Sequence, residues 1–259
     1  MRLANIIRAV RFEPWAITPA GHATLSAIVQ RAAAGGLRAD DSLLSQLIVS
    51  RPAMTIDENG TATIQIFGTL LSKSTAIEQT CGNTDYMQIR QEIGMAKAQG
   101  AERIVFAVDS PGGMVAGVRE TAQAIRTADM PTMAMVDGDA CSAAYWLASQ
   151  TDRIEATPSS VIGSIGVIMP WIDQDGAWEA MGMEWNPITN DGATLKGAGG
   201  GPSLTPEQRQ FLTDSANATA ADFWREITDV RGMLPEELKR AGFYEASRAI
   251  QMGLIDAVI

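Results

Sequence analysis

Apolar runs alternate with segments of helical periodicity between residues 61 and 136, and this alternation is the feature that most constrains the fold. The apolar runs predict strands and lie at residues 62–71, 103–108 and 131–136. The periodic segments predict helices and lie at residues 86–99 and 114–128. Strands and helices in this order predict right-handed crossovers and a largely parallel sheet. We therefore expect an α/β fold with a parallel sheet and flanking helices.

The chain divides into an N-terminal extension, residues 1–57, and a main domain, residues 58–259. The extension is expected to be mostly helical, with a flexible break at residues 34–36, and to pack on the core or contact a neighbouring subunit. In the domain, a long helix is predicted to run towards Val230, with Thr205 as its N-cap. Strands are expected at residues 152–156, 160–169 and 254–259, and shorter helices at 235–240 and 246–252.

Composition excludes several classes of protein. The chain has 259 residues, of which 46% are apolar, and a net charge of −10. This acidity disfavours binding to nucleic acid or to an anionic membrane. Arginines interrupt the N-terminus, and no run reaches the roughly 18 apolar residues of a membrane span. Cys81 and Cys141 form no metal-ligand spacing. We expect a soluble, cytoplasmic protein in a reduced compartment.

Two segments leave the carboxyl ends of predicted strands and are expected to be neighbours in space. They are DSPGG, residues 109–113, and DGDACS, residues 137–142. Ligands of parallel sheets bind beyond these ends of the strands. Pro111 fixes one dihedral angle, and the two glycines permit conformations closed to other residues, so this turn can aim an N–H group into a cleft. An ordinary strand-to-helix turn is the alternative.

Ser142 lies in the stretch VDGDACSAAYWLASQ, residues 136–150, for which we predict a turn at residues 137–139 and then a helix. A serine at the start of that helix would have an exposed hydroxyl beside the first free N–H groups of the helix. A serine nucleophile needs this geometry, because a developing oxyanion requires preorganised donors. The alternative is that Ser142 is merely an N-cap residue.

A serine nucleophile also needs a base. The single histidine, His22, lies in the extension and is interpreted as a surface or packing residue. A lysine can serve where burial keeps its amine neutral. The chain has four lysines, namely Lys73, Lys97, Lys196 and Lys239. Lys97 and Lys239 lie on solvated helical surfaces, Lys73 follows an apolar strand, and Lys196 lies in a glycine-rich loop with no acidic residue closer than Asp191.

These motifs together resemble a known family. DSPGG, then CSAAYWLASQTDRIEATPSSVIGSIGVI, then Lys196, and finally the ending AIQMGLIDAVI resemble the serine peptidases related to signal peptide peptidase A. The resemblance covers about residues 58–259 and is closest to the phage branch, the head maturation or capsid assembly proteases. It implies a ClpP/crotonase-like spiral α/β core.

The resemblance also implies roles for single residues. Ser142 resembles the nucleophile, Lys196 the general base, and Ser164 a serine that hydrogen-bonds the lysine amine. Gly113 resembles an oxyanion donor, and we expect the N–H of Ala143 to be the second one. Such a Ser/Lys dyad needs no metal, nucleotide or other cofactor. The alternatives are that Ser164 is a turn serine and that Lys196 is an exposed loop lysine.

The family further implies a homo-oligomeric endopeptidase that cleaves extended peptides after small residues. Its substrates would be phage scaffold or capsid proteins, in the host cytoplasm or inside a procapsid. The absence of an N-terminal membrane anchor favours the phage branch, whereas the absence of a following scaffold region departs from it. Three alternatives remain: a signal-peptide-degrading peptidase, a crotonase-like acyl-CoA enzyme, and a non-catalytic assembly protein.

Overall fold

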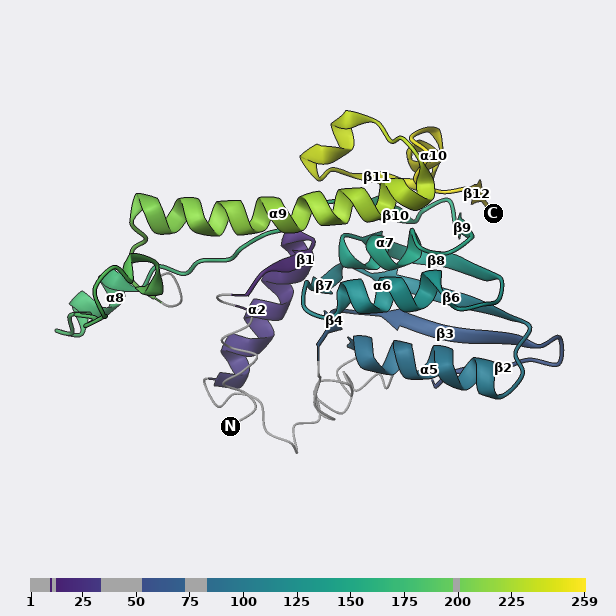
Figure 1. Ribbon diagram of the computed structural model, residues 1–259, viewed down its shortest axis with the longest axis horizontal. Helices are drawn as coiled ribbons and strands as arrows, with labels where there is room; N and C mark the ends of the chain where they lie inside the picture. The colour runs from purple at the N-terminus through teal and green to yellow at the C-terminus, as the bar shows by residue number, and fades with distance from the viewer. Residues whose placement is uncertain (1–9, 11–12, 34–52, 73–82, 198–200) are drawn as a thin grey trace.

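The computed structural model describes residues 10, 13–33, 53–72, 83–197 and 201–259 (Figure 1). The predicted break at residues 34–36, the rival base Lys73 and the cysteine Cys81 lie outside these ranges. Within them, the class predicted from the sequence is confirmed: the chain is an α/β protein with a mainly parallel sheet and flanking helices.

Eight strands of the described chain form the main sheet. They are β2 (Thr55–Ile56), β3 (Thr61–Phe67), β6 (Arg103–Ser110), β8 (Thr132–Cys141), β9 (Arg153–Ala156), β10 (Val161–Gly163), β11 (Phe243–Glu245) and β12 (Ala257–Val258). Their order is β11-β10-β8-β6-β3-β2, while β9 pairs with β8 and β12. The central pairs β3–β6, β6–β8 and β8–β10 are parallel. The predicted edge strand at residues 254–259 forms only over β12.

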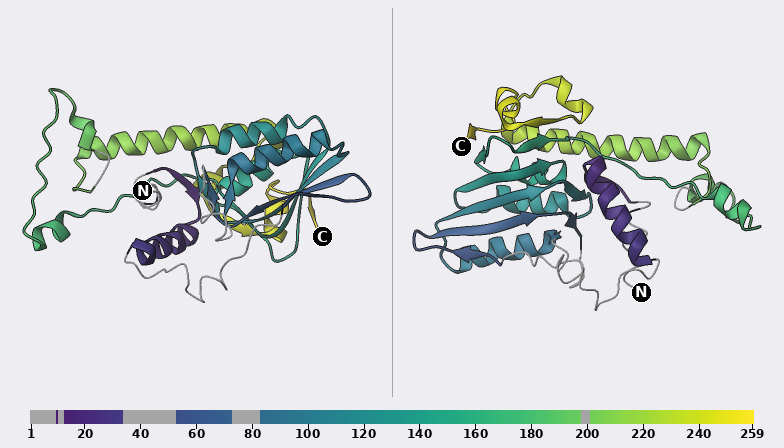
Figure 2. Two further views of the ribbon diagram at one scale, coloured as in Figure 1. Left: turned by 90° about the horizontal axis from the view of Figure 1, so that it is seen from below. Right: turned by 180° about the vertical axis from the view of Figure 1, so that it is seen from behind.

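Three helices cover one face of this sheet (Figures 1 and 2). They are α5 (Tyr86–Ala98), α6 (Val118–Arg126) and α7 (Ala143–Ala148). The strands bury alternate side chains, as the fully buried Ile64, Phe106 and Ala134 of β3, β6 and β8 show. This alternation follows from the period of two in strand side chains, and it places the core between the sheet and the helices.

A second, smaller sheet lies beside the carboxyl ends of β6 and β8. Its strands are β1 (Trp15–Ile17), β4 (Leu70–Leu71), β5 (Thr84–Asp85) and β7 (Gly112–Met114), in the order β1-β7-β4-β5. β1 was not expected from the sequence. It belongs to the extension, is followed by α2 (Pro19–Ala33), and pairs antiparallel with β7. This part of the extension therefore packs into the domain.

The structure corrects the predicted turns on either side of the site. Residues 137–139 do not form a turn but continue β8 to Cys141, because β10 pairs with β8 at residues 139–141. DSPGG is not a strand-to-helix turn either. Its first residues end β6 and its glycines form β7, so α6 begins at Val118 and not at Met114.

The longest helix, α9 (Pro206–Arg231), begins as the sequence predicts. Thr205 accepts the N–H of Gln208, and the Gln208 side chain accepts the N–H of Thr205, which forms a capping box. One end of α9 packs on the core, and the other projects away from it together with α8 (Asp175–Ala180) and the 3-10 helix η1 (Thr194–Gly197) (Figure 1). We call residues 170–197 and 201–222 the arm. None of the described helices is both long and apolar enough to cross a membrane.

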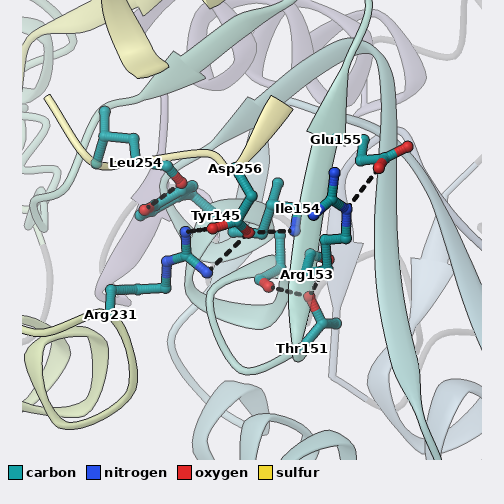
Figure 3. A network of polar contacts seen from close by, with 9 residues as sticks. Tyr145, Thr151, Arg153, Ile154, Glu155, Arg231, Leu254 and Asp256 are labelled. Atoms are coloured by element: carbon teal, nitrogen blue, oxygen red, sulfur yellow. Dashed lines mark hydrogen bonds and ion pairs between the residues drawn. The ribbon is translucent and has the colours of Figure 1, made fainter. Parts of the chain in front are cut away.

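An ion pair fixes the end of α9 that packs on the core (Figure 3). Arg231 donates to both carboxylate oxygens of Asp256, at 2.8 and 3.1 Å, and Asp256 also accepts the N–H of Ile154 at 2.7 Å. Nearby, the Tyr145 hydroxyl donates to the carbonyl of Leu254 at 2.9 Å. The C-terminus is thereby joined to β9 and α7. The last helical segments are η2 (Glu236–Arg240) and α10 (Ala246–Gln251).

Candidate active site

Ser142 lies between the end of β8 and the start of α7. Its backbone angles are φ 54° and ψ −119°, a conformation that residues with a side chain rarely adopt. Its N–H donates to Gly163 O at 2.7 Å, and its carbonyl accepts the N–H of Trp146 at 2.9 Å. Strain of this kind persists only where the surroundings hold it, and it occurs often at functional sites.

The side chain of Ser142 does not cap the helix. It makes no capping hydrogen bond, and its Oγ donates to Gly166 O at 3.2 Å. The interpretation of Ser142 as a simple N-cap residue is therefore wrong. The predicted exposure of its hydroxyl is wrong as well, because Ser142 is 0% exposed in this structure.

Ser164 lies beside Ser142. β10 pairs with the end of β8, Gly163 opposite Cys141, and Ser164 follows directly. It too has a positive φ of 53°, and its N–H donates to Gly242 O at 2.7 Å. With an exposed fraction of 5%, it is nearly as buried as Ser142. The two serines that the sequence singled out are thus neighbours.

The two predicted donor amides are also near Ser142. Ala143 is the first residue of α7, so its N–H has no acceptor within the helix. Gly113 lies in β7, and the backbone at the preceding Gly112 approaches the end of β8 closely. A Cβ added to Gly112 would lie 2.9 Å from Cys141 O. The structure therefore brings Ser142, Ser164, Ala143 and β7 together.

Lys196 lies elsewhere. It is exposed and belongs to η1, which α9 holds through a bond of 2.9 Å from Gln208 Nε2 to Thr194 O. The core contact of α9 is near Glu226, whose Oε2 accepts from Trp146 Nε1 of α7 at 2.7 Å. From residue 208 to residue 226, a helix extends about 27 Å at 1.5 Å per residue. Within one chain, Lys196 and Ser142 are consequently attached to opposite ends of α9.

The neighbouring carboxylates Asp109 and Asp139 confirm that the two predicted segments meet. The N–H of Asp139 donates to Asp109 Oδ1 at 3.0 Å, and Ser110 pairs with Ala140. Burial raises the pKa of the Asp139 carboxyl, and the charge of Asp109 raises it further. Burial, with the charge of Asp139, also raises the pKa of the Cys141 thiol to about 12, so this thiol stays protonated and is a poor nucleophile.

Sequence reasoning missed two parts of the site. One is Gly166, whose carbonyl accepts the Ser142 hydroxyl. The other is β1, which lies between β7 and Ile168. The short apolar run Trp15–Ile17, preceded by Pro14, was the available signal for a strand. His22 is a packing residue as predicted: its Nε2 lies 2.9 Å from Val10 O, and its ring meets the edge of Trp15.

The chain is an α/β protein with a buried serine at the carboxyl edge of its parallel sheet. Proteins of this class bind their ligands at that edge. Comparison with known families makes the class specific. Residues 124–259 match the model of Peptidase family S49, and the chain belongs to this family. The match includes Ser142, Ser164 and Lys196, and it begins after Gly113.

The curated relatives include two phage proteins. The chain is 29% identical to the capsid assembly protease C of Escherichia phage lambda over 85% of this chain and 54% of that protein. It is 30% identical to the head-tail preconnector protein GP5 of Enterobacteria phage P21, over 78% of this chain and 41% of that protein. The chain thus spans about half the length of the curated relatives it matches.

Among solved structures, the chain is similar in fold to an enoyl-CoA hydratase/isomerase family member. The sequence identity is 13% and the TM-score 0.46, over 80% of this chain and 69% of that one. This likeness concerns the fold alone.

Proposed function

We propose that the chain is a serine endopeptidase with a Ser142/Lys196 dyad. One observation carries this proposal: the strained backbone of Ser142 at the β8–α7 junction, where the amides of Ala143 and β7 surround it. Membership of Peptidase family S49 supports the same reaction class. A buried serine held at a positive φ beside a helix start suits acyl transfer, because its oxyanion finds donors already in place.

The proposed reaction has two halves. Ser142 Oγ attacks the carbonyl carbon of a peptide bond while its proton passes to the Lys196 amine, and the N–H groups of Gly113 and Ala143 stabilise the oxyanion. The Lys196 ammonium then protonates the leaving amine, and the C–N bond breaks. Water hydrolyses the acyl group from Ser142 with Lys196 again as the base. Ser164 hydrogen-bonds the amine and positions it.

Lys196 must come from a second copy of the chain in this scheme. Within one chain, it is attached to the end of α9 opposite Ser142, and its side chain is exposed there. The arm has exposed apolar side chains that suit a contact with another copy. They are Ile172, Met181, Met183, Trp185, Ile188 and Phe211, with exposed fractions of 36–101%. Seated against a neighbour, the arm would bury Lys196 and favour its neutral form.

The substrates we propose are scaffold or capsid proteins processed during phage head maturation, in the host cytoplasm or a procapsid. The phage lambda relative, a capsid assembly protease, supports this choice. Signal peptides are the alternative substrate class. A crotonase-like acyl-CoA activity has only the fold in its favour, and fold does not imply function. A non-catalytic assembly role leaves the strain at Ser142 unexplained.

Complementation between inactive variants tests the proposal. Ser142→Ala and Lys196→Ala are each expected to lower peptide hydrolysis by at least about 10³-fold, the scale on which loss of a catalytic residue acts. Mixed together, they should recover a substantial fraction of the wild-type rate if each site takes its lysine from a neighbour. Lys97→Ala is the matched control, because this lysine is exposed and pairs with Asp129.

Three results would contradict the proposal. Hydrolysis that persists in the Ser142→Ala variant removes Ser142 from the mechanism. Unchanged hydrolysis in the Lys196→Ala variant removes the lysine. Inactivity of the mixture, with the wild type active, excludes the supply of Lys196 by a second copy.

A further inference from the structure

The segment Pro14–Thr18 lies near Ser142 and has backbone partners on both of its edges. On one edge β1 pairs antiparallel with β7, Trp15 opposite Met114 and Ile17 opposite Gly112. On the other edge Trp15 exchanges two hydrogen bonds with Ile168, of 2.9 Å from its N–H and 2.8 Å to its carbonyl. The segment is therefore held as the middle strand between β7 and the chain that follows Ser164.

The register of this strand directs one carbonyl at a predicted oxyanion donor. Thr18 N–H donates to Pro111 O at 2.9 Å, and Val115 N–H donates to Pro14 O at 3.2 Å. Hydrogen-bonded pairs alternate along an antiparallel ladder, so the next such pair between these two is Ala16 with Gly113. The N–H of Gly113 accordingly faces the carbonyl of Ala16.

The same carbonyl is close to the end of β8. A Cβ added to Gly112 would lie 2.2 Å from Ala16 O and 2.9 Å from Cys141 O, which places both backbones against this glycine. Gly166, which accepts the Ser142 hydroxyl, is two residues before Ile168. Trp15 and Ala16 are 0% exposed, as is Ser142. The segment and the serine are thus buried at the same end of the sheet, where a substrate would have to bind.

We propose that the place between β7 and Ile168 is the peptide-binding groove of the enzyme and that Pro14–Thr18 occupies it in the register of a substrate. Ala16 takes the position before the scissile bond, because its carbonyl faces the Gly113 amide. The proposal rests on the proposed function for the role of Gly113. An extended peptide enters such a groove by strand addition, in which main-chain bonds give affinity and side-chain pockets give specificity.

The occupant indicates which peptides the groove accepts. Ala16 is fully buried, so the pocket before the scissile bond suits a small side chain. Trp15 is also fully buried, so the preceding pocket suits a large aromatic one, and Ile17 at 3% exposure indicates an aliphatic residue after the bond. The segment and an external substrate cannot share the groove. The segment must leave before a substrate binds.

A binding experiment in the full-length Ser142→Ala protein tests occupancy without catalysis. The probe is a fluorescent peptide with the sequence of residues 13–18, EPWAIT, and a scrambled peptide is the reference. Ala16→Trp places a side chain too large for the pocket and should displace the segment, so that the probe binds at least about tenfold more tightly. Ala23→Trp, at an exposed position of α2, is the matched control and should leave binding unchanged.

Hydrolysis of the same peptide separates this proposal from the proposed function. With Ser142 intact, Ala16→Trp should raise kcat/KM several-fold over the wild type. Suppose that the wild type hydrolyses the peptide and that Ala16→Trp changes neither hydrolysis nor binding. This result would overturn the proposal that Pro14–Thr18 occupies the groove, but it would leave the proposed peptidase activity standing. If Ala16→Trp binds the peptide more tightly but no variant hydrolyses it, the occupied groove would stand and the proposed peptidase activity would be overturned.

Hydrogen exchange covers the case in which Ala16→Trp does not fold. In the Ser142→Ala protein, saturating EPWAIT peptide should raise the exchange rates of the Trp15 and Thr18 amides at least tenfold, because the peptide displaces the segment from its hydrogen bonds. If the peptide leaves the exchange rates of these two amides unchanged, the proposal is overturned.

Discussion

Trp146 of α7 stacks on Phe223 of α9, with ring centroids 4.2 Å apart and an interplanar angle of 6°. Both rings are 0% exposed. Glu226, one turn further along α9, accepts the Trp146 Nε1–H at 2.7 Å and Arg119 Nε–H at 2.9 Å. This contact joins the helix that follows Ser142 to the helix whose other end holds Lys196. It fixes the direction in which the arm leaves the core.

Phe223→Ala is expected to lower the free energy of unfolding by about 3–5 kcal/mol, because it removes a buried ring and leaves a cavity under Trp146. Phe243→Ala is the matched control at a phenylalanine outside the arm. Phe243 is 62% exposed, and its truncation should cost less than about 1 kcal/mol. Urea unfolding of both variants measures the difference. Equal losses would show that the stack does not stabilise the junction of α7 and α9.

Local signals in the sequence were sufficient for much of the fold. The parallel sheet followed from the order of apolar runs and periodic segments, because each crossover has one favoured hand. The start of α9 followed from Thr205, Pro206 and Gln208, whose capping box involves only neighbours in the chain. The nearness of Ser142 and Ser164 followed from resemblance, and the β8–β10 pairing accounts for it.

The features that the sequence did not predict depend on distant partners. The turn expected at residues 137–139 became strand because β10 pairs with it, and no local signal reports such pairing. β1 was missed because a run of only three residues forms a strand through its pairing with β7 on one edge and Ile168 on the other, and both partners are distant in the sequence. The position of Lys196 depends on the length and direction of α9, which the packing of Phe223 on α7 determines.

Gly113→Ala should lower the rate of peptide hydrolysis by at least about 10²-fold, because the Gly113 amide, the predicted oxyanion donor, would be displaced. A Cβ at Gly113 would lie 2.0 Å from Leu70 O and 2.5 Å from Leu70 Cβ, so β7 must move away from β4. We expect a loss in the free energy of unfolding of about 2–3 kcal/mol. Kinetics with a fluorogenic peptide and urea unfolding measure the two effects.

Gly94→Ala provides the control for that substitution. Gly94 is exposed on α5 and has nothing within 4 Å of an added Cβ. Alanine should raise the free energy of unfolding there by roughly 0.5–1 kcal/mol through its helix propensity, without an effect on hydrolysis. A Gly113→Ala protein as stable and active as Gly94→Ala would contradict the close approach of β7 and β4.

Stability should fall in acid through Asp256. Burial alone raises the pKa of Asp256, but hydrogen bonds from Arg231 and Ile154 and the charges of Arg231 and Arg153 together outweigh it, so the pKa lies below that of an ordinary aspartate. A lowered pKa in the folded state gives stability that is complete above the unfolded pKa, about 3.9, and is lost as the pH falls through the folded value. Urea unfolding between pH 7 and pH 2.5 measures this decline.

Asp256→Asn should flatten that decline and lower stability at pH 7 by about 1–3 kcal/mol, because the Arg231 side chain, only 9% exposed, loses its charged partner. Asp129→Asn is the comparison, since Asp129 pairs with Lys97 at the surface and its side chain is 72% exposed. It should cost clearly less at pH 7. If the stability of Asp256→Asn fell in acid as steeply as that of the wild type, the decline would have to be assigned to other carboxylates.

The backbone of Ser142 gives a last prediction that separates strain from chemistry. Ser142→Ala and Ser142→Gly both lack the hydroxyl, so both should be inactive, but only glycine adopts φ 54° and ψ −119° without strain. Ser142→Gly is therefore expected to be more stable than Ser142→Ala by about 1 kcal/mol, since such strain costs about 1–3 kcal/mol and glycine loses more entropy on folding. Ala27→Gly, at an exposed position of α2, should instead destabilise by about 1 kcal/mol. If Ser142→Gly were the less stable of the two variants at residue 142, the conformation of this residue would store no strain, and the observation that carries the proposed function would lose its energetic basis.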